Sequence, residues 1–353
     1  MSQYAVTVMQ EGQRGEVEAL MAASFEKNLS SIFFLHTPTT LIVTCNDQVV
    51  AGLNLDVFVV NRRVKMGYLG WLYTHSEHRG RGLAGMLLEA AIPFLRDLGC
   101  TDIAGCVEGD NPASFKQLER ALFSRMSLGE QIKRFTCGLP TVYRHASRFF
   151  DMGYFLWHRS LDGWKKKPQL EGIQALVATL AANLILSLPI ILGWNVPALL
   201  GFTFVQDTRL LVAGIVLSLS VRTASQMVVA ARAKAEVTYL GWDTAYLTAL
   251  LAPLLLGLPF PVPGNVYIRG SHWSLKEHGG LLSQMALFST CTLALLCVVI
   301  PNAYTLLLLL LDTLFSFYPF CGFNASRLKR AGRWTRLLSR VLLLACTIFL
   351  LLY

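Results

Sequence analysis

The chain of 353 residues contains few of the motifs that hold metal ions or covalent cross-links. Its eight cysteines are scattered, and no two of them have C-x-x-C spacing. This pattern argues against a disulfide framework and against a zinc knuckle. We therefore expect most of the cysteines to be small apolar side chains in the interior.

A secretory signal is also missing. The start of the chain, Met1 to Tyr4, lacks the basic stretch and the apolar core that such a signal needs. We therefore expect the N-terminal domain to stay in the cytoplasm.

Charged residues become scarce after residue 170. Three long segments there, 173–193, 281–300 and 303–320, are nearly free of charge, and about 20 apolar residues are enough to cross a bilayer core of about 30 Å. The chain before residue 165 has the mixed charges of a soluble domain. We expect a soluble domain over 1–163 and an α-helical polytopic membrane domain over 164–353, which together make a multi-pass integral membrane protein.

The net charge of +9 does not by itself indicate a nucleic-acid partner. The basic clusters flank hydrophobic segments: Lys165 to Lys167 come before the first, and six cations between Arg327 and Arg340 come before the last. Positive-inside topology explains both clusters. We therefore expect a lipid bilayer, and no nucleic acid, as a partner.

The same rule selects a topology for the five hydrophobic segments. If 239–258 enters the membrane and returns, all the basic clusters fall on the cytoplasmic side, so we prefer this arrangement. Its irregular end, Gly257 to Gly264, is expected to be covered by protein or to line a cavity.

The first 160 residues have alternating strand and helix patterns. The turn residues Asn46 and Asp47 indicate a hairpin. Strands are predicted over 4–8, 41–45, 49–60, 64–73, 101–107 and 149–159, and helices over 15–25, 83–98 and 112–123; residues 124–144 receive no assignment.

A glycine-rich run, His78 to Gly85, lies between a predicted strand and a predicted helix. Backbone N–H groups in such a turn, together with the positive end of the helix dipole, suit a pyrophosphate. The alternative is a solvent-exposed, arginine-rich turn.

Residues Arg79 to Ala84 have the Q/R-x-x-G-x-G/A signature, and residues 1 to about 161 resemble the GNAT acetyltransferase superfamily. The resemblance implies an α/β fold, a mixed sheet with flanking helices, and acetyl-CoA or another acyl-CoA as co-substrate. It implies that the amides of Arg81, Gly82, Ala84 and Gly85, with Arg79 alongside, hold the pyrophosphate. It also implies a strand that splays from its neighbour to bind the pantetheine arm. The implied cofactor-binding residues are Trp71, Leu72, Tyr73, Arg79, Gly80, Arg81, Gly82, Leu83, Ala84, Gly85 and Asn111.

Such enzymes use direct attack by an amine, which requires a base and often an acid. Glu108 and Glu77 are the candidate bases, unless both are only solvated carboxylates. The family's usual tyrosine acid is a phenylalanine within Arg148–Tyr154. Tyr143 or Tyr73 could replace it, or water could protonate the leaving group.

Residues from about 170 to 340 resemble the site-2 protease family. The resemblance depends on Pro263–Ile268, Gly279–Gln284 and Phe317–Ala325. Protease chemistry needs H-E-x-x-H, but residues 220–226 hold no histidine or carboxylate, and Asn324 stands at the third ligand position. We therefore expect no metal and an inactive protease fold.

Two charges lie in apolar surroundings, Arg222 and Asp312. Charges at this depth are costly and are usually paired or line a cavity. Either the two face one another or a polar crevice, or Arg222 snorkels to the surface.

These patterns together predict a membrane-anchored N-acyltransferase that acts on an amine of a protein or a lipid. The alternative is a non-enzymatic membrane adaptor in which acyl-CoA occupancy controls partner binding.

Overall fold

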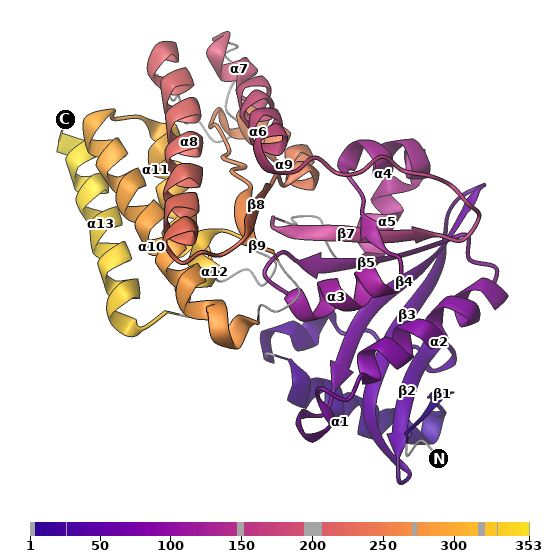
Figure 1. Ribbon diagram of the computed structural model, residues 1–353. Coiled ribbons are helices and arrows are strands. Elements are labelled where there is room, and N and C mark those ends of the chain that lie inside the picture. Colours follow the sequence, from indigo (N-terminus) through magenta and orange to yellow (C-terminus); the bar gives the residue numbers. More distant parts are fainter. Residues whose placement is uncertain are drawn as a thin grey trace. The chain divides into compact units, whose positions relative to one another are not determined.

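The structure is a computed structural model that describes residues 4–25, 27–146, 152–193, 207–269, 274–316, 322–329 and 331–352 (Figure 1). The chain divides into two compact units. The first consists of Met1–Val107, Ala113–Phe149 and Phe155–Gln169. The second consists of Leu170–Tyr353 and two short segments, Glu108–Pro112 and Phe150–Tyr154.

A seven-stranded mixed sheet forms the centre of the first unit, in the order β1-β2-β3-β4-β5-β7-β6. Strands β1 to β4 are an antiparallel meander, and β5 is parallel to β4. The strands are β1 (Tyr4–Val8), β2 (Thr40–Cys45), β3 (Gln48–Asn61), β4 (Val64–Thr74), β5 (Asp102–Glu108), β6 (Ser124–Arg125) and β7 (Tyr154–Ser160).

The hairpin between β2 and β3 is confirmed. Asn46 and Asp47 have φ of 50° and 63°, the left-handed conformation that the favoured two-residue hairpin turn requires. Short polar side chains tolerate this region better than most, which explains why these two residues indicate the turn.

Helices cover both faces of this sheet. The three predicted helices are confirmed as α1 (Arg14–Ser24), α2 (Leu83–Asp97) and α3 (Pro112–Arg120), and the unassigned stretch contains α4 (Leu128–Phe135) and α5 (Leu139–Ala146). Val17, Leu20 and Met21 of α1 pack with one apolar cluster, and α4 and α5 pack with another. Short 3-10 turns occupy Glu11–Gln13, Lys27–Ile32, Thr37–Thr39, Ser76–His78 and Thr136–Gly138.

A buried carboxylate at the start of β5 connects this sheet to α4. Asp102 accepts two hydrogen bonds from Arg134, at 2.9 and 2.7 Å, and one from His158 Nε2 at 2.7 Å. Burial opposes its charge, but the hydrogen bonds from His158, Arg134 and Thr101 lower the pKa of Asp102 below its ordinary value. Burial also lowers the pKa of His158. The native state therefore holds a charged Asp102 beside a neutral His158.

This arrangement predicts that acid weakens the first unit. Because unfolding restores the ordinary histidine pKa of about 6.5, unfolded chains take up a proton at His158 first, and stability is lost as the pH falls below that value. Hydrogen exchange of β5 and β7 amides in the full chain should give a lower opening free energy at about pH 5 than at about pH 7.5. His158→Gln, which still donates to Asp102 but does not titrate, should reduce this difference; an unchanged difference would assign the effect to other groups.

The second unit is mainly helical. Its described helices are α6 (Gly172–Leu186), α7 (Leu188–Ile191), α8 (Thr208–Arg232), α9 (Tyr246–Leu256), α10 (Leu275–Val299), α11 (Ala303–Leu314), α12 (Asn324–Lys329) and α13 (Arg333–Leu352); a 3-10 turn covers Asp243–Ala245, and strands β8 (Val237–Leu240) and β9 (Asn265–Ile268) pair antiparallel. Helices α8, α10, α11 and α13 lie side by side (Figure 1).

Two helices in the described part of the chain are long and apolar enough to cross a membrane, Thr208–Arg232 and Glu277–Val299. Buried core helices of soluble proteins can have the same length and apolar composition. The segments expected over 173–193, 239–258 and 303–320 instead give helices of 15, 11 and 12 residues, shorter than the roughly 20 that a span needs. The expected number of crossings is therefore not supported by the helix lengths.

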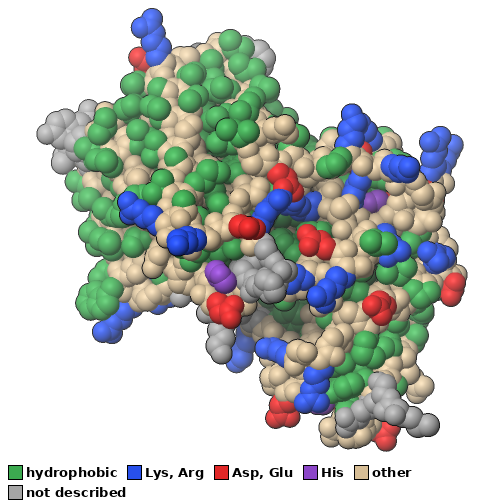
Figure 2. Space-filling model, in the orientation of Figure 1, with side chains coloured by type: hydrophobic (Ala, Val, Ile, Leu, Met, Phe, Trp, Pro, Cys, Tyr) green, Lys and Arg blue, Asp and Glu red, His purple; other side chains and the backbone are tan. Residues whose placement is uncertain are grey.

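The surface of this unit is nonetheless strongly apolar. In Figure 2, hydrophobic side chains are spread over its visible face, with few charged groups between them. Large apolar side chains on its helices are half or more exposed, among them Leu295 at 65% and Leu344 at 60%. Such continuous apolar surfaces usually mark contact with a partner or a membrane.

Arg222 and Asp312 form a buried ion pair. Arg222 donates to Asp312 through Nε at 2.7 Å and through Nη2 at 3.0 Å, and both side chains are fully buried. Arg222 Nη1 also donates to the carbonyl oxygen of Gly264 at 3.0 Å. The pairing hypothesis is thus confirmed, and snorkelling of Arg222 is wrong, because its guanidinium has two acceptors within the core.

Breaking this pair from one side should be costly. Asp312→Leu leaves a buried cation, and Arg222→Met leaves a buried anion, so each should lower the unfolding free energy in detergent by about 3–5 kcal/mol. The double variant should lose much less than the sum, because neither charge then needs a partner. Additive losses in thermal or denaturant unfolding would contradict the coupling.

Candidate functional site

Strands β4 and β5 pair over only part of their length. Their described pairs run from Met66–Asp102 to Tyr68–Ala104, whereas β4 remains paired with β3 as far as Thr74. Beyond Tyr68 the edge of β4 that faces β5 is therefore available to another hydrogen-bonding chain. Trp71, Leu72 and Tyr73 lie on this half of the strand.

The glycine-rich run forms the turn before α2. Gly80 and Gly82 have φ of +78° and +81°, a conformation that side chains oppose. Gly82 is the N-cap and supplies no side-chain acceptor, and a Cβ at either glycine would meet no atom within 4 Å. The first amides of α2, at Leu83, Ala84 and Gly85, precede the first intrahelical donor, Met86. These three amides therefore have no acceptor within their own helix.

A pocket of about 540 Å³ lies in front of this turn. The predicted residues that line it are Leu72, Tyr73, Arg79, Gly80, Gly82, Leu83 and Ala84. It is also lined by the end of α1, by Thr74 and His78, and by one face of α3. The pocket thus joins the free edge of β4 to the start of α2.

The charges around this pocket favour an anion. Arg79, Lys116 and Arg120 line it, and no carboxylate does. Arg79 is exposed, and its Nε donates to the carbonyl oxygen of Thr74 at 3.3 Å, which holds the guanidinium beside the turn. Uncapped helix amides and nearby cations together can bind a pyrophosphate.

Two of the predicted binding residues, Arg81 and Gly85, are not among those that line the pocket. The Arg81 side chain turns to the hydroxyl of Tyr4, at 2.7 Å, and to the carbonyl oxygen of Glu77, at 3.2 Å, so only its backbone is left for a ligand. Gly85 does not line the pocket; a Cβ there would come within 3.1 Å of Gln117 Oε1. Its glycine is therefore explained by close packing against α3.

The side chains of Trp71 and Tyr73 belong to the core. Trp71 packs against Phe25 and Phe33, with ring centroids 5.0 and 4.8 Å apart. The hydroxyl of Tyr73 donates to Asn54 at 2.9 Å, and burial raises the pKa of Tyr73 well above its ordinary value. A buried hydroxyl whose hydrogen is already donated to another side chain is poorly placed to protonate a leaving group. The interpretation of Tyr73 as the acid is therefore not supported.

Tyr143 and Glu77 lie apart from the pocket lining. Tyr143 is on α5, packs against the cluster that contains Phe135, and donates to Gln131 at 2.9 Å. Glu77 is an exposed residue of the turn that precedes Gly80. The structure does not bring Tyr143 to this pocket, because α5 packs with a different apolar cluster from the one that holds Tyr73.

Glu108 and Asn111 are close neighbours at the end of β5. Glu108 is the last residue of the strand and is half-buried, and its carbonyl oxygen accepts a hydrogen bond from the Asn111 amide at 3.0 Å. Pro112 then begins α3, where a missing N–H costs nothing. The segment 148–151, where the family's tyrosine acid was expected, lies outside the described residues.

The sequence did not identify one face of α3 as part of the pocket. Ala113, Lys116, Gln117 and Arg120 line the pocket together, and their i, i+3, i+4, i+7 spacing puts them on one side of a helix. This spacing, and the two cations on a helix next to the glycine-rich turn, could have identified α3 as part of the pocket.

Within the described residues, no group of three or more His, Cys, Asp or Glu side chains is placed to hold a metal ion. Asn324, at the third ligand position of the protease resemblance, instead donates from its side chain to Ser289 at 2.7 Å and to Asp312 at 3.0 Å. It accepts from Gln226 at 3.1 Å.

Comparison with known protein families supports the resemblance to GNAT acetyltransferases that the sequence indicated. Residues 8–122 match the model of the acetyltransferase (GNAT) family. These residues form a GNAT acetyltransferase domain. Enzymes of this family transfer an acyl group from acyl-CoA to an amine, so the chain is an acyl-CoA-dependent N-acetyltransferase with acetyl-CoA as co-substrate. The family match covers the splayed strand, the glycine-rich turn and α3.

Solved structures resemble the GNAT part of the chain in fold. One is the NatC complex bound to Gag peptide and CoA, with 20% identity over 45% of this chain and 98% of that chain, and a TM-score of 0.34. Another is the ribosomal-protein-S18-alanine N-acetyltransferase from Escherichia coli, with 12% identity, 47% and 99% coverage, and a TM-score of 0.34. No curated protein matches the sequence.

We call the glycine-rich turn and the first amides of α2 the α2 cradle. A negative charge placed there should prevent acetyl-CoA binding without harming the fold. Ala84→Glu puts a carboxylate in the first turn of α2, where it suits the helix dipole but repels phosphate. Calorimetric titration of the full chain should show at least tenfold weaker binding. Gly129→Glu adds the same charge to the first turn of α4, at an exposed position away from the pocket, and should bind normally; equal binding by all three proteins would place the cofactor elsewhere.

Proposed function

We propose that the protein is a membrane-anchored N-acetyltransferase that binds acetyl-CoA at the α2 cradle and acetylates a primary amine. The observation that carries the proposal is the uncapped start of α2, which faces a cationic pocket beside the free edge of β4. Leu83, Ala84 and the turn amides would hold the pyrophosphate. The edge of β4 from Trp71 to Tyr73 would hydrogen-bond the pantetheine arm and orient the thioester.

The reaction needs little beyond this orientation and a base. The acceptor nitrogen attacks the thioester carbon, a C–N bond forms, and the C–S bond breaks as CoA leaves as a thiolate. One proton passes from the attacking nitrogen to a carboxylate, directly or through water. Since the Tyr73 hydroxyl already donates to Asn54, water protonates the thiolate.

Glu108 is our candidate for the base. It ends β5, the strand that leaves β4 at the point where the thioester is expected, and it is half-buried. Glu77 is exposed and precedes the cradle, and it is the second candidate. Asn111 would orient water or the pantetheine from the same turn as Glu108.

The proposed membrane anchor is the second unit. Its support consists of the two long apolar helices α8 and α10, the exposed apolar side chains on neighbouring helices, and the basic residues at the start of α13. Anchoring would restrict acceptors to amines near a bilayer, on a protein or on a lipid.

We further propose that this unit has the architecture of a site-2 protease without its zinc. Arg222 and Gln226 are four residues apart on α8, the separation of the two histidines in H-E-x-x-H, and Gln226 bonds to Asn324. Arg222 brings its own positive charge, which Asp312 neutralises. A guanidinium in this place would exclude a metal cation, so the unit would hold a substrate segment without cleaving it.

The decisive experiment measures both binding and turnover with the full chain in detergent or vesicles. Acetyl-CoA is supplied with a panel of amino-terminal peptides, lysine peptides and aminated lipids, and thiol release is recorded. Turnover with any acceptor supports the enzyme. Tight binding without turnover on the whole panel would favour the adaptor alternative.

Glu108→Gln tests the proposed base. We expect kcat to fall by about 10²-fold or more, while acetyl-CoA binding is unchanged. Glu77→Gln is the matched control and should retain activity. The reverse outcome would assign the base to Glu77, and full activity in both variants would leave deprotonation to solvent.

A further inference from the structure

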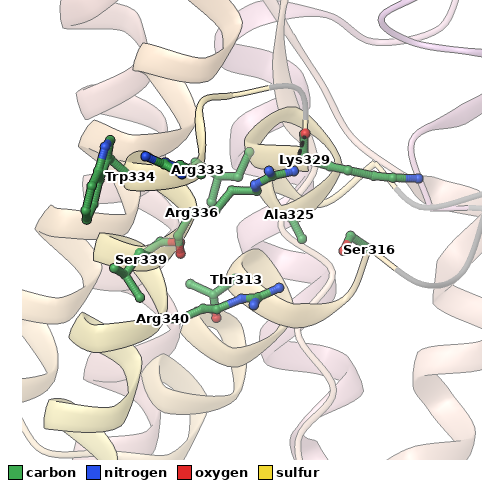
Figure 3. Close-up of a pocket in the computed structure, with 11 residues that line it drawn as sticks. Thr313, Ser316, Ala325, Lys329, Arg333, Trp334, Arg336, Ser339 and Arg340 are labelled. Atoms are coloured by element: carbon green, nitrogen blue, oxygen red, sulfur yellow. Dashed lines mark hydrogen bonds between the residues drawn. The ribbon is translucent and has the colours of Figure 1, made fainter.

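A second pocket, distinct from the acetyl-CoA site, lies entirely within the second unit. It has a volume of about 810 Å³ and is formed by the end of α11, by α12 and by the first two turns of α13 (Figure 3). Four cations line it, Lys329, Arg333, Arg336 and Arg340, and no carboxylate does.

The three arginines of this basic pocket come from one helix. Arg333, Arg336 and Arg340 have i, i+3, i+7 spacing, which places them along one face of α13. Figure 3 shows Arg336 and Arg340 extending across the pocket toward Ala325 and Thr313. Arg336 Nη1 donates to the carbonyl oxygen of Lys329 at 3.1 Å, so one wall of the pocket helps to position it.

The surrounding sequence offers no acid to neutralise this face. Residues 313–353 contain six lysines and arginines and no aspartate or glutamate. The one nearby carboxylate, Asp312, is fully buried and paired with Arg222. None of the three α13 arginines forms an ion pair with a carboxylate in the described part of the chain. An anion from outside the chain would therefore be attracted to the pocket.

Apolar surface continues directly from the pocket along α13. Leu337 lines the pocket and is 50% exposed, and Val341, Leu344 and Ile348, which follow it along the helix, are 47 to 60% exposed. Trp334, at the start of the helix, is 70% exposed, and tryptophan favours the membrane–water boundary. A ligand that satisfies both parts needs an anionic head and hydrocarbon chains.

We propose that this basic pocket binds the phosphate headgroup of an anionic phospholipid, whose acyl chains lie along α13. The guanidinium groups of Arg336 and Arg340 hold the phosphate, since arginine matches phosphate oxygens with paired N–H donors. Basic pockets between helices at a membrane surface bind lipid headgroups in this way. The site rests on the proposed membrane anchor, and it gives that anchor a preference among lipids.

The test uses native mass spectrometry of the detergent-solubilised full chain with phosphatidylglycerol, phosphatidylcholine or inorganic phosphate. We expect one phosphatidylglycerol to be retained, in preference to phosphatidylcholine. Arg336→Gln/Arg340→Gln should weaken this binding at least tenfold. The matched control, Arg209→Gln/Arg232→Gln, removes two exposed arginines at the ends of α8 and should bind normally.

Three results would overturn the lipid site. Equal loss in both double variants would mean that only net charge matters. Equal retention of both lipids would show that the headgroup is not recognised. Displacement of the lipid by millimolar inorganic phosphate would assign the pocket to a free anion.

Carbonate extraction of the full chain from membranes tests the anchor separately. Release from the membrane would contradict the membrane proposal. Retention together with no phosphatidylglycerol preference would contradict the lipid site alone.

Discussion

The start of α2 is a set of backbone donors with no acceptor in their own helix, and the proposed chemistry of this protein depends on that deficit. A serine or aspartate at the N-cap would satisfy one of these amides and occupy the space in front of them. Gly82 does neither, and its positive φ turns the chain so that the first amides of α2 face the pocket. The proposed site therefore depends on an uncapped helix end, where the substrate would supply the hydrogen-bond acceptor that the chain does not.

Strand β4 shows how the core and the site share one segment. Its side chains at Trp71 and Tyr73 pack inward against aromatic rings and Asn54, which fixes the strand in place. Its backbone, released from β5 after Tyr68, is left to bind ligand. Because packing and recognition use different atoms of the same residues, the strand can be rigid and still have free hydrogen-bonding groups.

Local patterns were enough to predict most of the first unit. The Asn46-Asp47 turn, the strand-like runs on either side of it and the helical spacing in α2 each depend on neighbours within a few residues. Helices α4 and α5 were missed because each has only eight residues, and their apolar faces become recognisable only against the sheet. The long apolar runs of the second half were read as longer helices than they are, since hydrophobicity continues past Leu186 and past Leu314, where α6 and α11 end.

The candidate site was predictable where it is local and hidden where it is not. The glycine-rich turn can be recognised from its sequence. The same sequence does not show that the Arg81 side chain turns to Tyr4 while Arg79 stays beside the pocket. Likewise, Arg222 and Asp312 are 90 residues apart, and sequence alone could not choose between a pair and two separate charges. Which charges meet is decided by the packing of whole helices.

The burial of Asp312 also affects how copies of the protein approach one another. From residue 278 to residue 353 it is the one carboxylate in the sequence, and Arg222 neutralises it in the core. The arginines at the exposed start of α13 therefore have no exposed acidic side chain beside them in this part of the sequence. The Debye length is about 30 Å at 0.01 M salt and about 10 Å at 0.1 M, so two such ends repel across more than a helix diameter in dilute buffer and only near contact in concentrated buffer. Repulsion between two such ends therefore weakens as the ionic strength rises.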